Sequence, residues 1–331
     1  MAPSQSLMPV MAGYRFPPVI RTPSSPYCQR WHRGGWHSWK HVSEGGFDRR
    51  RFRVAEVNEG IAKRFIAERH FLGSFPAARM SFGLLTDDDA LASGLEVDGY
   101  ALVGVAVLSV PMRADVLTRV FPDLEPYVQS VELGRLCLTD GVAPNGESWL
   151  LGQVWRQAAA QGVRGVVSFA DPFPRSRIVT GTDPDGRVME RVETVSPGHV
   201  GIAYQGAGAV ACGRSTARTL LYLPRHGAVL PERTLSKVRR EESGHEAAER
   251  LLVRYGATPR TWGQAGQQWL HEALNAVGAV RVRHPGNFRY AWPIGTRAQR
   301  RRVHINLPAT RYPKQATDLI AGAPVRPLDG W

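Results

Sequence analysis

The chain has 331 residues, enough for one large domain or two small ones around a substantial hydrophobic core. Three scattered cysteines without a CxxC pair exclude a disulfide framework and a thiolate zinc site, and no apolar run is long enough to span a bilayer. The 42 Lys and Arg residues outnumber the 29 Asp and Glu residues, and the net charge of +13 favours an acidic partner, nucleic acid before membrane. A generally arginine-rich composition is the alternative explanation of this charge. Because the N-terminal residues also lack a signal-peptide pattern, the sequence predicts a cytoplasmic protein that does not bind membranes.

Residues 1–48 are predicted to form an arm outside the folded core. Residues 1–26 are rich in Pro, Ser and Gly, a composition typical of flexible segments. Residues 27–48 differ, because three Trp and three His alternate there with Arg, Lys and Gly. Aromatic rings among cations are suited to stack on bases and contact phosphates, but the Trp side chains could equally plug apolar grooves as a structural clasp.

Strands and helices alternate in the segment that follows. Residues 53–57 predict a strand, and Asn58 predicts the cap of a helix that ends at Arg69-His70. Residues 80–85 and 100–110 predict two further strands, the second of them central because it is apolar throughout. His70 therefore lies at a helix C-terminus, where it could cap the helix or serve as a base or ligand.

Residues 131–171 predict a strand, a turn, a helix and a second strand. The first strand ends at Leu138, Asn145 is placed to cap the helix, and the second strand covers residues 163–169. Elements of this length predict a right-handed crossover between parallel strands. Ligands in open α/β sheets bind beyond the carboxyl ends of strands, so we expect the active site beside Asp171.

The second half of the chain is predicted to be more divided. In chain order we expect a loop with a hairpin tip (172–198), a helix start (199–205), a strand (217–223), two amphipathic helices (231–278), a strand segment (281–294) and a basic tail. The predicted organisation is an N-terminal arm (1–48), an α/β core (49–230), a helical insertion (231–279), and a C-terminal strand with a basic tail completing the core (280–331).

Missing motifs argue against several enzyme classes. The chain has no G-x-S-x-G elbow, no Walker A loop, no GxGxxG fingerprint and no PCxxC element of a zinc deaminase. The remaining layout is an α/β (α+β) fold, a mixed central sheet with flanking helices, as in the GNAT acetyltransferases. In that fold the acyl-CoA pyrophosphate meets a helix N-terminus and the thioester lies between two splayed parallel strands. Residues 143–148, APNGES, replace the usual Gly-rich loop.

An ordered set of motifs resembles the Mom proteins, a family of phage-associated adenine modification proteins. The motifs are HFLGS (70–74), LGRLCLTDGVAPNGES (133–148), VVSFADP (166–172), GHVGIAYQGAG (198–208), GNFRYAWP (286–293) and RYPK (311–314). The resemblance covers about residues 50–225 and 280–315. Phe71 and Phe169 depart from it, because the family has Tyr at both places, so any chemistry of those phenols is missing here.

The resemblance implies a GNAT-like enzyme that converts the exocyclic amine of adenine in double-stranded DNA to a carbamoylmethyl derivative. The modification would protect phage or mobile DNA from restriction. An acyl-CoA donor and iron are the cofactors that the resemblance implies. An adenine inside a duplex must be flipped out to reach such a site.

The candidate catalytic residues are His70, Ser148, Asp171 and His199. Asp171 would accept the amine proton or, with the two histidines, form a His/His/carboxylate iron site, and Ser148 would orient the donor. Each also has a structural interpretation, as a helix or turn cap. Residues expected to contact the cofactor are Leu138, Asn145, Gly146, Ser148 and Tyr204. Residues expected to contact DNA are Arg135, Asn287, Arg289, Tyr290 and Arg301.

Two other functions fit the same sequence. A GNAT-type N-acetyltransferase acting on a small molecule or a protein would share the fold but leave the charge and the aromatic–basic segments unexplained. A non-catalytic DNA-binding antirestriction protein would use the charge without needing Asp171 or His70. The sequence gives no oligomeric state, donor or DNA sequence context.

Overall fold

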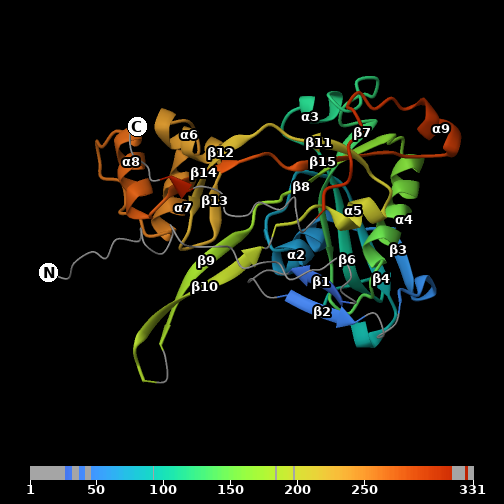
Figure 1. The fold of residues 1–331 in the computed structure, drawn as a ribbon, viewed down its shortest axis with the longest axis horizontal. Coiled ribbons are helices and arrows are strands. Elements are labelled where there is room, and N and C mark those ends of the chain that lie inside the picture. The colour runs from blue at the N-terminus through green and yellow to red at the C-terminus, as the bar shows by residue number, and fades with distance from the viewer. Residues whose placement is uncertain are drawn as a thin grey trace.

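The computed structural model describes residues 27–31, 37–41, 46–91, 93–182, 185–196, 198–314 and 325–326. Figure 1 shows a large sheet with its helices, a smaller unit of helices and short strands beside it, and a long hairpin that projects from the junction. In the Trp-rich arm only backbone pairing is described, between β1 (Tyr27–Trp31) and β2 (His37–His41), so its predicted stacking on bases lies outside the described residues.

The large sheet has eight strands in the order β11-β15-β8-β7-β6-β4-β3, with β5 paired to β6. Its strands are β3 (Phe52–Glu56), β4 (Ala78–Thr86), β5 (Glu96–Val97), β6 (Tyr100–Ser109), β7 (Ser130–Leu138), β8 (Gly165–Ala170), β11 (Val210–Arg214) and β15 (Phe288–Pro293). The accompanying helices are η2 (Arg49–Arg51), α2 (Glu59–Arg69), η3 (Asp89–Leu91), α3 (Asp115–Thr118), α4 (Gly146–Ala160), α5 (Ile202–Gly206) and α9 (Arg297–Arg302). Among these strand pairs, β7–β8 is parallel and the others are antiparallel. The predicted mixed α/β sheet with flanking helices is therefore confirmed.

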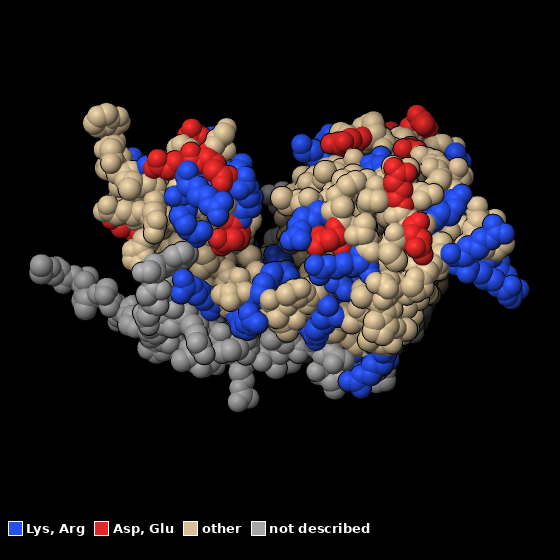
Figure 2. Space-filling view, turned by 90° about the horizontal axis from the view of Figure 1, so that it is seen from above, with Lys and Arg blue, Asp and Glu red and all other residues tan. Residues whose placement is uncertain are grey.

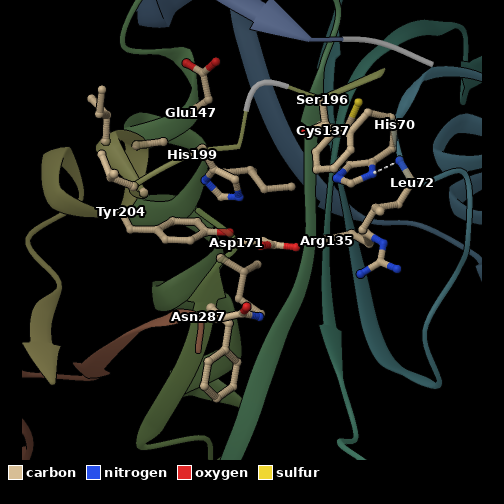
Figure 3. A pocket seen from close by; sticks show the side chains of 18 of the residues that line it. His70, Leu72, Arg135, Cys137, Glu147, Asp171, Ser196, His199, Tyr204 and Asn287 are labelled. Carbon is tan, nitrogen blue, oxygen red and sulfur yellow. Dashed lines mark hydrogen bonds between the residues drawn. The ribbon is translucent and has the colours of Figure 1, made fainter. Parts of the chain in front are cut away.

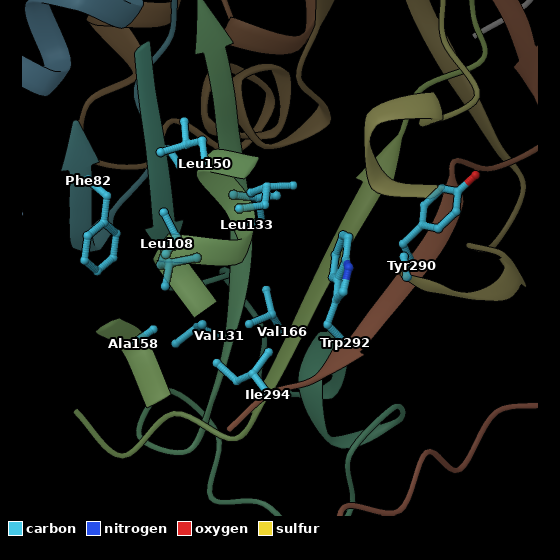
Figure 4. Packing of buried hydrophobic residues seen from close by; sticks show 14 of the residues in the cluster. Phe82, Leu108, Val131, Leu133, Leu150, Ala158, Val166, Tyr290, Trp292 and Ile294 are labelled. Atoms are coloured by element: carbon cyan, nitrogen blue, oxygen red, sulfur yellow. The ribbon is translucent and has the colours of Figure 1, made fainter. Parts of the chain in front are cut away.

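Two apolar clusters enclose this sheet. One face packs against α4, whose buried Leu150, Leu151 and Val154 meet strand residues such as Leu133 and Trp292 (Figure 4). The other face packs against α2 through a second cluster of buried residues. Burial of these apolar side chains is the main driving force that holds the layers together.

The smaller unit has its own sheet and its own core. Its sheet has the order β13-β12-β14-β16, formed by β12 (Arg218–Leu223), β13 (Ala228–Leu230), β14 (Val280–His284) and β16 (Val325–Arg326). The helices α6 (Glu232–Arg240), α7 (His245–Arg254) and α8 (Gly266–Ala276) pack around a separate cluster of buried side chains.

Two predictions for this region were wrong in detail. The expected two helices are three, because Glu241 and Gly244 adopt positive φ angles of 53° and 81° and interrupt the first one. The expected strand over residues 281–294 is two strands, β14 in the small sheet and β15 in the large one, since the turn at Pro285-Gly286 redirects the chain.

The predicted hairpin is a two-stranded ribbon of β9 (Arg175–Thr182) and β10 (Val188–Ser196). Figure 1 shows it projecting away from both units. Within the described residues, no helix has the length and apolar character needed to cross a membrane.

Candidate functional site

A cavity of about 700 Å³ lies where β7 and β8 separate. The two strands pair only through Ser130–Glu132 and Gly165–Val167, although both continue beyond these residues. Gly134 is an extra residue in β7, because Arg135 pairs with Val107 and Leu133 with Leu108. The bulge and the short pairing open a gap between parallel strands in the middle of the sheet.

Ser168 bridges the strands at the closed end of the gap. Its buried hydroxyl donates a hydrogen bond to the Leu133 carbonyl, at 2.9 Å. The backbone of β8 has diverged from β7 at this point and no longer pairs with the Leu133 carbonyl, so the Ser168 side chain satisfies that oxygen instead.

Figure 3 shows the candidate residues on two sides of the cavity, with His199, Tyr204 and Asp171 facing His70 and Arg135. His70 follows α2, Arg135 lies in β7 and Asp171 follows β8. His199 lies just before α5 and Tyr204 within it. The structure thus brings together His70, Ser148, Asp171 and His199, which the sequence analysis named as catalytic candidates.

Asp171 is fully engaged by the protein. Oδ1 accepts hydrogen bonds from the Phe173 amide at 2.9 Å and from His284 Nε2 at 3.0 Å, and Oδ2 accepts one from Arg175 at 2.8 Å. Burial opposes ionisation, but the bonds from His284 and Arg175 outweigh it and hold the pKa of Asp171 well below its usual value. Such a carboxylate is a poor base, so the proton-accepting role expected for Asp171 does not fit this geometry.

His284 holds Asp171 in a defined way. It lies on β14 in the small unit, is completely buried, and accepts a hydrogen bond from the Gly286 amide at Nδ1, at 3.0 Å. The proton of the neutral ring is therefore on Nε2, which donates to Asp171. The backbone oxygen of Asp171 in turn accepts a hydrogen bond from the His199 amide, at 2.8 Å. A series of hydrogen bonds therefore leads from His284 in the small unit, through Asp171, to His199 in the cavity.

His70 is buried and neutral. Its Nδ1 accepts a hydrogen bond from the Leu72 amide at 3.1 Å, which leaves Nε2 as a donor. Burial, followed by the charges of Arg135, His199 and Arg175, lowers the pKa of His70 to about 3. His70 therefore offers an N–H group rather than a cation or a strong base.

His199 and Glu132 have side chains without a hydrogen-bond partner among the described residues, and both line the cavity. Burial lowers the pKa of His199, so its imidazole is neutral near pH 7. Burial raises the pKa of Glu132, and Arg135 partly opposes this shift. Both groups can accept a proton, and the sequence analysis missed Glu132 because it lies inside an apolar strand.

Tyr204 closes the cavity opposite β7. Burial raises the pKa of its hydroxyl, and the Ser168 side chain hydrogen-bonds to it and lowers that pKa in part. The ring packs edge-on against Tyr290 and Trp292 at centroid distances of 5.5 and 5.6 Å. A protonated phenol held in this way is suited to donate a proton.

The start of α4 forms the outer wall of the cavity. Asn145 has a positive φ of 74° and makes no side-chain cap bond, so its predicted capping role is wrong. Ser148 Oγ donates instead to the Asn145 carbonyl, at 3.1 Å. A Cβ at Gly146 would lie 2.6 Å from a Val142 methyl, so this position requires glycine.

The iron site expected from His70, Asp171 and His199 is not formed. The described part of the chain contains no cluster of three or more His, Cys, Asp or Glu side chains arranged to bind a metal ion. Asp171 already uses both oxygens for protein donors, which leaves it poorly suited as a ligand. This donor set does not fit the metal that the family resemblance implies.

The residues expected to contact DNA separate into three groups. Tyr290 is completely buried and donates to the Val200 carbonyl, so its expected DNA contact is wrong. Arg135 and Asn287 line the cavity, and Arg135 is held by Ser74 through two hydrogen bonds of 2.9 and 2.8 Å. Arg289 is partly buried outside the cavity, and Arg301 is exposed on α9.

The positions where the Mom family has Tyr also line the cavity. Phe71 stacks on His70 with ring centroids 4.4 Å apart, and Phe169 faces the cavity from β8. Of the expected cofactor contacts, Leu138, Asn145, Ser148 and Tyr204 line the same space.

Comparison with known proteins supports the family assignment for part of the chain. The model of the Mom protein family matches residues 51–175. A search of curated proteins finds no similar sequence. Among solved structures, a protein assigned as a phosphinothricin N-acetyltransferase has a TM-score of 0.23 and 11% identity, covering 43% of this chain and 95% of its own. A tandem GNAT protein from the clavulanic acid biosynthesis pathway has a TM-score of 0.28 and 9% identity, covering 74% of this chain and 75% of its own.

The matched segment contains β3 to β8, α2 and α4, and hence the separating strands, His70 and Asp171. The resemblance found in the motifs is therefore confirmed over residues 51–175, the segment that the Mom family model matches.

Proposed function

We propose that the protein modifies the exocyclic amine of adenine in double-stranded DNA, giving a carbamoylmethyl derivative. The observation that carries this proposal is the cavity between β7 and β8, which opens inside the Mom-matching segment and gathers proton donors and acceptors. Its volume of about 700 Å³ is in the range of small-molecule sites, large enough for a flipped base and part of a donor.

The amine of adenine is a weak nucleophile because its lone pair is delocalised into the ring, so it needs help with its proton. Glu132 is the group best suited to take this proton, because burial raises its pKa and its side chain has no hydrogen-bond partner among the described residues. His199 also has no such partner but is the weaker base, because burial lowers its pKa. Asp171 acts as a positioning residue, because its backbone oxygen holds the His199 amide and its carboxylate holds Arg175.

Two donors face the acceptors. The neutral His70 ring presents Nε2–H to the cavity and can hydrogen-bond to a carbonyl oxygen. The Tyr204 hydroxyl, which stays protonated near neutral pH, can give a proton to a leaving group.

The residues present fit an acyl-CoA donor. The start of α4 has no side-chain cap hydrogen bond, and an adjoining surface pocket is lined by Arg49, Arg50 and Arg156 beside Ser148. These groups would hold the phosphates, and the gap between β7 and β8 would admit the thioester arm. Such a donor would supply an activated carbonyl carbon, which serves the direct acyl transfer considered below and not the N–CH₂ bond of the carbamoylmethyl product.

Nucleoside mass spectrometry tests the proposal. Plasmid DNA from cells expressing the wild type should contain a deoxyadenosine species with the mass gain of a carbamoylmethyl group. Tyr204→Phe should lower its yield about 10²- to 10⁴-fold, the usual contribution of a general acid. Tyr100→Phe is the matched control, because it removes a tyrosine hydroxyl from β6, at a position that does not line the cavity. Unmodified DNA from well-folded wild-type protein would refute the proposal.

Acyl transfer to an amine is a second candidate, favoured by the strand gap and the start of α4. Direct acyl transfer joins the amine nitrogen to a carbonyl carbon, whereas the carbamoylmethyl product joins it to a CH₂ carbon. The same measurement therefore separates the two reactions on DNA. Turnover of acetyl-CoA with small amines in the absence of DNA would instead indicate a small-molecule acetyltransferase.

A further inference from the structure

A second cavity, of about 200 Å³, lies along the edge strand β11 and outside the cavity described above. Three of its nine lining residues are arginines, namely Arg214, Arg289 and Arg311, and none is acidic. A small space surrounded by guanidinium groups is suited to an anion, and the fork of an arginine matches a phosphate particularly well.

Arg289 is the residue that most requires an external partner. It is partly buried on β15, and burial lowers its pKa, so the protein interior disfavours its charge. Burial is the largest cause of this shift, the Cys212 side chain opposes it, and the second cation Arg119 adds to it. Within the part of the chain that the structure describes, the Arg289 side chain lies 5.8 Å from the centroid of the Phe169 ring but forms no ion pair or hydrogen bond. A bound anion would offset the cost of this buried charge.

Of the other two arginines, Arg214 is held by its side chain and Arg311 through its neighbours in the chain. The guanidinium of Arg214 lies 3.9 Å from the centroid of the Phe288 ring and donates to the Gly286 carbonyl at 3.2 Å. The backbone of Arg311 lies between two residues that fasten the tail, since the Thr310 amide donates to Ala211 at 2.8 Å and the Tyr312 hydroxyl donates to Ala209 at 2.6 Å. A preorganised donor such as Arg214 loses little conformational entropy on binding.

The two cavities have neighbouring lining residues at the start of β15. Asn287 lines the first cavity and the next residue, Phe288, lines the second. Arg218, at the mouth of the first cavity, lies 3.5 Å from the Asn287 side chain. Figure 2 shows Lys and Arg side chains on both sides of the hollow between the two units. A polyanion could therefore contact the second cavity while one of its bases reaches the first.

We propose that Arg214, Arg289 and Arg311 bind one backbone phosphate of the DNA strand whose flipped-out adenine enters the first cavity. The identification of the phosphate as part of DNA rests on the proposed function. The recognition of a phosphate rests on the three arginines alone.

The test is the salt dependence of binding of the full chain to a generic DNA duplex. Arg289→Gln and Arg311→Gln should each weaken binding several-fold for all sequences and reduce the slope of log affinity against log salt by about 1. Arg64→Gln is the control, because it removes the same charge from an exposed residue of α2 that pairs with Glu68. Arg311 is exposed, so its replacement tests the site even if Arg289→Gln fails to fold.

Inorganic phosphate provides the second arm of the experiment. An unchanged salt slope in both variants, equal to that of Arg64→Gln, overturns the proposal. A second result would overturn the DNA assignment alone. In that case inorganic phosphate raises the Tm of the wild type but not that of Arg289→Gln, and neither substitution changes the affinity for DNA. Reduced slopes support the proposal even if no modified adenine is found, an outcome in which only the proposed function fails.

Discussion

The two units of the molecule contribute to the cavity in different ways. The large sheet provides its walls and most of its polar groups, from β7, β8, α2 and α4. The small unit has a complete apolar core of its own and contributes few groups, notably His284 behind Asp171 and Arg218 at the mouth. The cavity chemistry therefore depends on a unit outside the segment that matches the Mom family.

The largest expected effect tests whether the two units unfold together. Leu150→Ala in the large unit and Leu252→Ala in the small unit both empty a fully buried position, and each should lower the free energy of unfolding by about 2–5 kcal/mol. Because His284, Tyr222 and Phe173 make contacts between the units, we expect one urea transition for both variants. Hydrogen exchange that loses protection only in α7 of Leu252→Ala would show separate unfolding.

A smaller effect is expected at the hydrogen bond between His284 and Asp171, which joins the two units. His284→Ala removes a donor to the Asp171 carboxylate and should lower the free energy of unfolding by about 1–3 kcal/mol. His245→Ala is the control, since its partner Glu249 lies within the same helix and its loss should cost about 0–1 kcal/mol.

The pH dependence of this difference follows from the pKa of Asp171. The folded state holds that pKa below its usual value of 3.8, so the stabilisation is complete above about pH 4 and is lost as the pH falls below it. The difference between wild type and His284→Ala in urea unfolding should therefore shrink below pH 4. A difference independent of pH would mean that His284 acts by packing alone.

His70 should produce a pH dependence over a different range. Its pKa is about 3 in the folded protein against a usual value of 6.5, so the unfolded chain binds one more proton between these values. Stability should fall by up to about 1.4 kcal/mol per pH unit as the pH drops through this range. His70→Gln should flatten the curve of unfolding free energy between pH 6.5 and 3, and an equally steep curve in the variant would contradict the assignment.

The sequence predicted the parts of the fold that depend on local pattern. The apolar run at 100–110, the Asn58 cap and the strand–helix–strand stretch all correspond to elements in the structure. The location of the site also followed, because strand ends and loops in one stretch must meet. The local sequence pattern could not predict contacts between residues that are far apart in the sequence.

Three particular residues illustrate that limit. His284 meets Asp171 across 113 positions, and nothing local to residues 281–287 indicates it. Glu132 lies in an apolar strand, where its burial becomes visible only once β8 is placed beside it. Tyr290 lies in a strongly basic and aromatic motif that indicated DNA contact, yet tertiary packing buries its ring completely.

The smallest effect is expected at the exposed end of the large unit. Arg301 lies on α9 in a cluster with Arg300 and Arg302, and none of these has a carboxylate partner in the described residues. Arg301→Gln should change the free energy of unfolding by less than about 0.5 kcal/mol. It should reduce the salt slope of DNA binding by less than Arg289→Gln does, since an exposed side chain stays hydrated and more mobile on binding. An equal loss for both variants would extend the DNA contact to α9 and remove the special role of the half-buried arginine.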